Sequence, residues 1–371
     1  MSCSAVASAP GVHFDPFPSG DENGLRAMGS GDPACPKEMV HGPCGGVRDD
    51  GGCEVEGIAC PFADATSPVA WAGPDARTES SITPPARWLL DVRIDDTLPR
   101  LEPWADRLRA LDAVVLIGEH LDEPISIAPA VAARRCADIG LGALVTVTGR
   151  DRTAQQATHE VGAVVEAGAV GVHCVTGDHP RARFPDRPGS VRFGSDGVRI
   201  AALAASAGAG LVSVAESPAA TPTAIRPGRL LEKERAGATM GVLNHAGGVV
   251  DLEAFAREVR RGGAQLPLAA PVPVITSRRA AEALMAFPGL VLPDGFAAAI
   301  VASDQPVTDG VEAAVTFAAD LLGGHAYRSI NLSGGASLPS VERIEVLVRI
   351  IESVEERVGP TAAPSPRQPA G

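Results

Sequence analysis

Apolar residues form eight short runs along the central part of the chain, and polar or helical segments separate them. Each run is apolar at consecutive positions instead of alternating with polar residues. Strands that are buried on both faces of a parallel sheet have this pattern. The expected strands are Trp88–Arg93, Ala113–Ile117, Ala143–Thr148, Val170–Val175, Gly210–Ala215, Thr239–Asn244, Val272–Ile275 and Arg328–Leu332.

The segments between these runs carry the spacing of amphipathic helices. In the last of them, Val341, Ile344, Leu347 and Ile351 share one helical face. Glycine follows several segments, as at Gly140, where a left-handed helix cap is expected. The predicted helices are Leu98–Leu111, Ile125–Ile139, Ala154–Ala167, Asp196–Ala207, Pro227–Ala236, Asp251–Gly262, Ser277–Phe287, Val311–Leu322 and Ser340–Val358.

Eight strands that alternate with helices predict an α/β fold, specifically a closed (β/α)8 TIM barrel. No GxGxxG motif opens the first unit, which disfavours an open dinucleotide-binding sheet. The expected organisation is a flexible leader (1–30), a four-cysteine metal-binding module (31–62), a linker (63–86), the barrel (87–358) and a disordered tail (359–371).

Composition excludes some classes of partner. The net charge is −13 and the chain has one Tyr and three Trp, so neither a basic surface nor an aromatic platform for nucleic acid is expected. No apolar run reaches the roughly 20 residues of a membrane helix, and the first ten residues do not resemble a signal peptide. We therefore expect a cytoplasmic protein with no nucleic acid or membrane partner, either as a homo-oligomer or with a partner subunit.

Four of the seven cysteines lie close together in CPKEMVHGPCGGVRDDGGCEVEGIAC. Cytosolic cysteines are usually reduced, and four thiolates can surround one metal ion. Glycine-rich turns let a short backbone wrap the ion. We expect Cys35, Cys44, Cys53 and Cys60 to bind zinc or, alternatively, an iron–sulfur cluster; His41 is an alternative ligand, and unliganded thiols remain an open interpretation.

Polar residues follow most of the predicted strands. The carboxyl ends of barrel strands form one rim, where barrel enzymes hold their substrates. The convergence of so many polar groups predicts a small-molecule site at this rim. The candidates include Asp91, Thr148, Gly177, Asp178, Asn244 and Arg278.

Several of these segments resemble the methylenetetrahydrofolate reductase family. VTVTGRDRTAQQ, CVTGDHP, LLEKERAGATMGVLN, PVPVITSRRAAEAL and INLSGG are similar, in this order, to segments of that family's barrel. CPKEMVHGPCGG…GGCEV looks like a cysteine-rich module found with some members, here placed before the barrel. The resemblance implies a folate-dependent one-carbon enzyme that reduces 5,10-methylenetetrahydrofolate to 5-methyltetrahydrofolate.

The resemblance also implies roles for single residues. Asp91 would be the acid that protonates the folate nitrogen, and Asp178 would face the pterin and the flavin. Asn244 would bind the pterin edge, and Arg278 would bind the glutamate tail. Thr148, Gly177 and Lys233 would contact the FAD cofactor, Lys233 at its phosphate.

Some positions depart from the family pattern. Ser217 and Thr221 stand where the family has Tyr and His, and Thr176 stands in place of an arginine. These changes remove stacking and charge-assisted contacts to the flavin. Direct reduction by NAD(P)H, a flavin-independent tetrahydrofolate-dependent transferase or demethylase, and a non-catalytic folate-binding or electron-transfer subunit are therefore alternatives.

Overall fold

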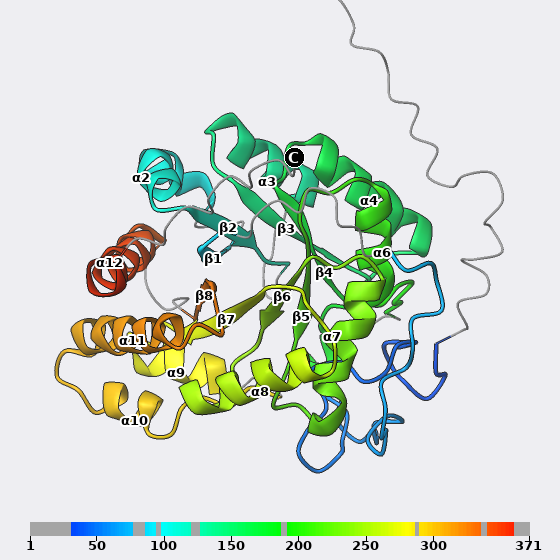
Figure 1. The fold of residues 1–371 in the computed structure, drawn as a ribbon. Helices are drawn as coiled ribbons and strands as arrows, with labels where there is room; N and C mark the ends of the chain where they lie inside the picture. Colours follow the sequence, from blue (N-terminus) through cyan, green and yellow to red (C-terminus); the bar gives the residue numbers. More distant parts are fainter. Residues whose placement is uncertain are drawn as a thin grey trace, which may run out of the picture.

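A computed structural model describes residues 31–76, 86–93, 98–119, 127–186, 191–285, 289–334 and 340–359. Eight parallel strands form a closed barrel in which neighbours in sequence are neighbours in space (Figure 1). The last strand closes the barrel against the first, with Trp88 opposite Ile330. The predicted (β/α)8 barrel is confirmed. The strands are β1 (Trp88–Val92), β2 (Ala113–Ile117), β3 (Ala143–Thr148), β4 (Gly171–Val175), β5 (Val212–Glu216), β6 (Met240–Leu243), β7 (Leu268–Pro273) and β8 (Ser329–Ser333).

Helices surround the barrel and bury their apolar faces against the outward side chains of the strands. Thr153 and Gln156 form a capping box at the start of α4, which satisfies backbone N–H groups there. The helices are α2 (Ala105–Ala110), α3 (Pro129–Asp138), α4 (Ala154–Glu166), α5 (Pro180–Arg183), α6 (Gly197–Ser206), α7 (Arg226–Arg235), α8 (Val249–Arg261), α9 (Arg278–Met285), α10 (Phe296–Val301), α11 (Pro306–Gly323) and α12 (Ser340–Val358), with three short 3-10 turns at Leu98–Arg100, Glu102–Trp104 and Thr223–Ile225.

The predicted position of β7 was wrong. This strand begins at Leu268, four residues before the expected Val272. Its sequence, LAAPVP, contains alanine and proline, which have low strand propensity. β7 pairs with β6 only at Leu268 and Ala269. Pro271 and Pro273 come after these residues, so neither proline is paired with β6.

Inside the barrel, a layer of apolar side chains is followed, toward the carboxyl ends of the strands, by a layer of polar side chains. Leu89, Leu116, Leu144 and Met240 pack together in an interior cluster. Side chains two residues apart face the same side of a strand, so Asp91 and Thr146 continue these rows toward the carboxyl ends of the strands. The polar interior therefore lies where a barrel holds its site.

The N-terminal segment, residues 31–76, consists of turns and lies against the barrel beside α7 (Figure 1). Residues 77–85 of the expected linker (63–86) lie outside the described residues, and the part before them contacts the barrel. Trp71 is buried against Val198 and Ala236, and its backbone N–H donates to Glu232 at 2.7 Å. The expected leader (1–30) and nearly all of the expected tail lie outside the described residues.

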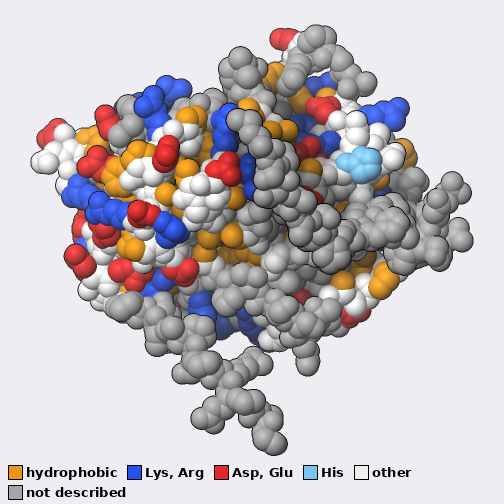
Figure 2. Space-filling view, turned by 90° about the horizontal axis from the view of Figure 1, so that it is seen from above, with side chains coloured by type: hydrophobic (Ala, Val, Ile, Leu, Met, Phe, Trp, Pro, Cys, Tyr) orange, Lys and Arg blue, Asp and Glu red, His pale blue; other side chains and the backbone are white. Residues whose placement is uncertain are grey.

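On the face seen in Figure 2, Lys and Arg side chains are interspersed with Asp and Glu among the described residues. Within the described ranges, no helix combines the length and apolarity needed to cross a membrane.

Candidate functional site

A cavity of about 730 Å³ opens among the carboxyl ends of the strands. Cavities of 300–1,000 Å³ are typical of small-molecule sites. Asp91 of β1, Asp178 after β4 and Asn244 after β6 all line it. The N-terminal segment supplies another part of the wall with Lys37, Met39, Cys44, Gly45, Gly46 and Glu54.

Asp91 lies in the cavity wall and is densely surrounded by protein. Burial raises the pKa of its carboxyl group to about 7, and a hydrogen bond from Asn331 opposes the rise. Asn331 is itself buried and lines the same cavity. A carboxyl group with this pKa exists in both protonation states near neutral pH, as a general acid requires.

Asp178 follows a sharp turn at the end of β4. Gly177 has a φ of 92°, in the left-handed region that favours glycine. A Cβ at Gly177 would lie 3.1 Å from Cβ of Thr148, so the loop packs closely on β3. This turn brings both Gly177 and Asp178 to the cavity wall.

Of the other predicted substrate ligands, Asn244 lines the cavity and Arg278 does not. The Asn244 amide donates to the Ser217 hydroxyl at 2.7 Å, which fixes the side chain. Arg278, at the start of α9, is exposed. The next residue, Arg279, lines the cavity in its place.

Thr148 lies at the end of β3 and is fully committed to protein contacts. Its hydroxyl donates to Glu119 at 3.1 Å and accepts from Arg152 at 2.9 Å. Glu119 lines the cavity, whereas Thr148 is absent from the lining. Thr148 therefore orients Glu119 and Arg152 and does not itself face the cavity.

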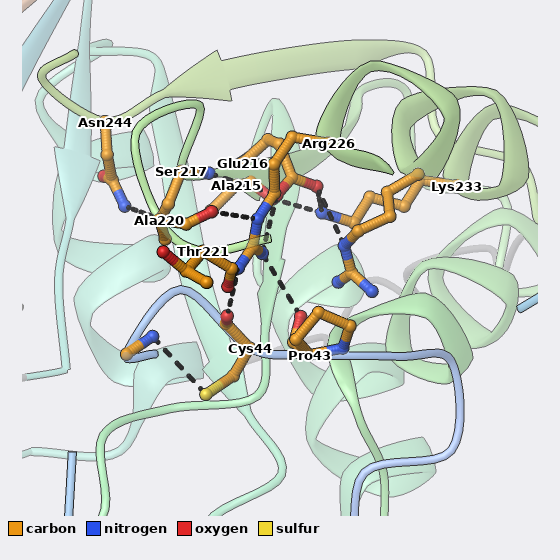
Figure 3. A network of polar contacts seen from close by, with 12 residues as sticks. Pro43, Cys44, Ala215, Glu216, Ser217, Ala220, Thr221, Arg226, Lys233 and Asn244 are labelled. Atoms are coloured by element: carbon orange, nitrogen blue, oxygen red, sulfur yellow. Dashed lines mark hydrogen bonds and ion pairs between the residues drawn. The ribbon is translucent and has the colours of Figure 1, made fainter. Parts of the chain in front are cut away.

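Lys233 belongs to a buried charge cluster around Glu216 (Figure 3). Its ammonium lies 2.5 Å from Oε2 of Glu216 and 2.5 Å from the carbonyl oxygen of Ala215. Arg226 and Arg229 also contact Glu216, at 3.3 Å and 3.4 Å. Burial alone would raise the pKa of Glu216, but these three cations lower it to about 2.

Two of these cations, Arg226 and Arg229, also hold the N-terminal segment. Arg226 donates to the carbonyl oxygens of Pro43 and Cys44, at 3.3 Å and 3.0 Å (Figure 3). Arg229 donates to the carbonyl oxygen of His41. A side chain at Gly45 would overlap the Ser217 hydroxyl, so the segment lies directly on this loop. Lys233 and Ser217 stand where the resemblance places the flavin, and both line the cavity. Lys233 is paired with Glu216, however, and Ser217 lies against the segment, so as arranged these two residues do not fit a flavin.

A second attachment joins His41 to the start of α6. The imidazole Nδ1 of His41 lies 2.9 Å from Oδ2 of Asp196, and the backbone N–H of His41 donates to the same oxygen at 3.0 Å. Asp196 also caps α6 by accepting from the N–H of Arg199. The alternative metal ligand His41 is therefore occupied in docking the segment.

The four cysteines of the segment share one local geometry. Each sulfur accepts a hydrogen bond from the backbone N–H two residues later, at Lys37, Gly46, Val55 and Phe62. Burial raises the pKa of the thiols of Cys35, Cys53 and Cys60, the last to about 11. As its side chains stand, the described part of the chain has no group of three or more Cys, His, Asp or Glu spaced to hold a metal ion.

Sequence reasoning missed the contribution of the segment to the cavity. Lys37, Glu54 and Arg229 line the cavity but were not among the predicted site residues. Lys37 and Glu54 lie far from the barrel strands in sequence, so strand periodicity gave no signal for them. A charged Lys inside a short cysteine-rich stretch is the one local feature that could have drawn attention.

One family model matches the N-terminal region. Residues 29–89 match the family described as "Methylene-tetrahydrofolate reductase C terminal". The match includes all four cysteines of the segment and the start of β1, and it confirms the predicted resemblance to this family over these residues. No curated protein matches the chain.

Some solved structures are similar to the chain at low sequence identity. One is an uncharacterised protein from Clostridium thermocellum, described as a protein that "binds two copies of 5-methyl-5,6,7,8-tetrahydrofolic acid"; it is 10% identical, with a TM-score of 0.47, over 73% of this chain and 94% of that one. Another is 2,3-dimethylmalate lyase, with 14% identity and a TM-score of 0.42 over 78% of this chain and 89% of that one.

Proposed function

We propose that this protein is a folate-dependent one-carbon enzyme that reduces 5,10-methylenetetrahydrofolate to 5-methyltetrahydrofolate without a bound flavin. The observation that carries the proposal is the common cavity of Asp91, Asp178 and Asn244. The resemblance assigns these residues to the proton donor and the pterin contacts. The match of residues 29–89 to a methylenetetrahydrofolate reductase family supports a folate-related function for the chain.

In this proposal, Asp91 supplies the proton. Protonation of the folate nitrogen N10 breaks its bond to the bridging carbon and leaves an iminium ion at N5. A hydride from NADH or NADPH then reduces the iminium carbon to a methyl group. An acid with a pKa near 7 can donate this proton at neutral pH and be reprotonated afterwards.

Asp178 and Asn244 would hold the pterin. A pterin has a row of N–H donors beside a carbonyl acceptor, which a carboxylate and an amide can match. The Ser217 contact fixes the Asn244 amide in advance. Preorganised polar groups of this kind lower the entropic cost of orienting a substrate.

The absence of a flavin from the proposed reaction is supported by the contacts of Lys233 and Ser217. Lys233 is 5% exposed and paired with Glu216, and the segment lies on Ser217. A flavin at these residues would have to displace the segment and leave buried charges unpaired.

The test uses purified full-length protein with 5,10-methylenetetrahydrofolate and either NADH or NADPH, with and without added FAD. We expect oxidation of the nicotinamide to depend on the folate and to be unchanged by FAD. Formation of 5-methyltetrahydrofolate is followed by chromatography. Folate binding without turnover by either nicotinamide would instead favour a transferase or binding subunit, and no folate binding would reject the proposal.

We further propose that Cys35, Cys44, Cys53 and Cys60 bind one zinc ion that holds the segment in shape. The support is the shared N–H to sulfur hydrogen bond at all four cysteines, because such bonds stabilise thiolate charge. The thiols must draw together around the ion. Their turns are short and rich in glycine, so this movement needs little rearrangement of the barrel.

A further inference from the structure

The N-terminal segment (residues 31–76) brings one buried ammonium group to the cavity of the barrel. Lys37 is 5% exposed and lines the cavity, although it comes from outside the barrel. Its Nζ lies 2.7 Å from Oε1 of Glu54, a segment residue that is equally buried. Burial of a lysine is unfavourable unless nearby anions compensate it.

This ion pair is linked to the loop that carries Asp178. Oε1 of Glu54 also accepts the backbone N–H of His179 at 2.7 Å. His179 directly follows Asp178, so a continuous chain of contacts runs from Lys37 through Glu54 to this loop.

The charges around Lys37 are therefore not confined to one pair. The Lys37 ammonium contacts Glu54 directly, and Asp178 lines the same cavity, near enough to interact electrostatically with Lys37. Glu54 has a second partner in His179. The charge of Lys37 is thus available to Asp178 as well as to Glu54.

We propose that Lys37 is a positioning residue of the barrel site, which holds the loop after β4 and keeps the Asp178 carboxylate directed into the cavity to accept N–H groups of the ligand. This inference rests on the proposed function for the identity of the ligand. It makes the cysteine segment a part of the binding site and not merely an appended module. Removal of the Lys37 charge then weakens ligand binding even when the segment remains folded.

The test compares the full-length protein with Lys37→Met, Lys37→Arg, Glu54→Gln and the double variant Lys37→Met/Glu54→Gln. Binding of 5-methyltetrahydrofolate is measured by calorimetry. We expect Lys37→Met to weaken binding at least about tenfold and Lys37→Arg, which keeps the positive charge, to recover most of the affinity, because charged hydrogen-bonded groups contribute on this scale. Glu54→Gln keeps an oxygen that can accept the His179 N–H, so we expect it to weaken binding less than Lys37→Met does. Hydrogen exchange of residues 31–76 checks that the segment remains docked.

The double variant Lys37→Met/Glu54→Gln distinguishes a positioning role of Lys37 from a role that only neutralises the charge of Glu54. If Lys37 only neutralises Glu54, removing both charges restores binding, and that result overturns the proposal, as does parental affinity of Lys37→Met. We expect the double variant to bind as weakly as Lys37→Met, because Asp178 still lacks its cation.

If the parent protein does not bind folate, that result rejects the proposed function alone. The role of Lys37 is then tested by a measurement that uses no ligand. Thermal unfolding of Lys37→Met, Asp178→Asn and their double variant forms a cycle that needs no ligand. A coupling between the two sites supports the positioning role, and additive shifts overturn it.

Discussion

Oε2 of Glu216 lies 2.5 Å from the ammonium of Lys233, and Arg226 and Arg229 contact the same carboxylate. One anion at the end of β5 thus serves three buried cations of α7. Two of these cations, Arg226 and Arg229, also bind backbone carbonyls of the N-terminal segment. Glu216 therefore couples the stability of the barrel to the docking of the segment.

Replacement of Glu216 by Gln is expected to destabilise the protein strongly. It leaves three buried cations without an anion, and breaking a buried ion pair at one side typically costs about 3–5 kcal/mol. Urea unfolding measures the loss. The matched control is Glu312→Gln, which removes the partner of Arg357 in an exposed pair and should cost less than about 1 kcal/mol. Similar losses in both variants would contradict the role of Glu216.

The pH dependence of the same cluster has a defined direction. The folded-state pKa of Glu216 is lowered to about 2, below its usual value. A carboxyl group with a lowered pKa contributes stability above its unfolded pKa and loses it as the pH falls toward the folded value. The stability difference between the parent and Glu216→Gln should therefore shrink between about pH 5 and pH 2, as urea unfolding at several pH values can measure.

Asp91→Asn is expected to remove the proton donor with little damage to the fold. The rate of folate reduction should fall by about 10²–10⁴-fold, the usual contribution of general acid catalysis. Since burial raises the pKa of Asp91 to about 7, the parental rate should decline as the pH rises above about 7. Single-turnover rates measured over this range test both statements. A parental profile that does not change near pH 7 would contradict the assignment of Asp91.

The raised pKa of Asp91 also predicts how stability changes with pH, in the direction opposite to that of Glu216. The folded protein binds the Asp91 proton more tightly than the unfolded chain, so stability falls as the pH rises from about 4 to 7. Asp91→Asn lacks this penalty. Its free energy of unfolding, relative to the parent, should therefore increase over that interval, which urea titrations at pH 4 and pH 8 would detect.

The sequence was sufficient to predict the barrel because its signal is repeated eight times. The ranges of β2 and β3 agree with the structure at both ends, and β7 was misplaced because proline and alanine weakened its pattern. Asp91 and Asp178 could be placed at one rim because the carboxyl ends of parallel strands always meet there. The pattern therefore determined which end of the barrel carries the polar groups.

The partners of these side chains could not be predicted in the same way. Lys233 was expected at a flavin phosphate, yet it lies in a buried cluster whose other members come from β5, α7 and the segment. Neither periodicity nor motif spacing describes contacts between residues 43–44 and residue 226. Such contacts depend on how the segment folds against the barrel, and that depends on side-chain packing across the whole structure.

Asp196→Asn is expected to loosen the segment while it preserves α6. The Asn oxygen can still cap the helix by accepting from Arg199, but it loses the charge that attracts His41 at 2.9 Å. Hydrogen exchange at residues 40–46 should become faster. Asp251→Asn at the start of α8 is the matched control, since Asp251 accepts from the N–H of Gly248 at the start of its own helix. Equal protection of the segment in both variants would contradict the role of Asp196.

The cysteine segment should carry one zinc ion per chain after purification without chelators. Cys53→Ser is expected to lose the metal, because serine is a poor ligand for zinc at a thiolate site, and to expose residues 31–62 to proteolysis. Cys136→Ala is the control, as Cys136 is buried among apolar residues of the barrel, and it should keep the metal. Mass spectrometry of the metal content and the visible absorbance spectrum distinguish zinc from an iron–sulfur cluster. Because segment residues line the cavity, loss of the metal should also weaken folate binding; unchanged binding by metal-free protein would show that the segment keeps its place without the ion.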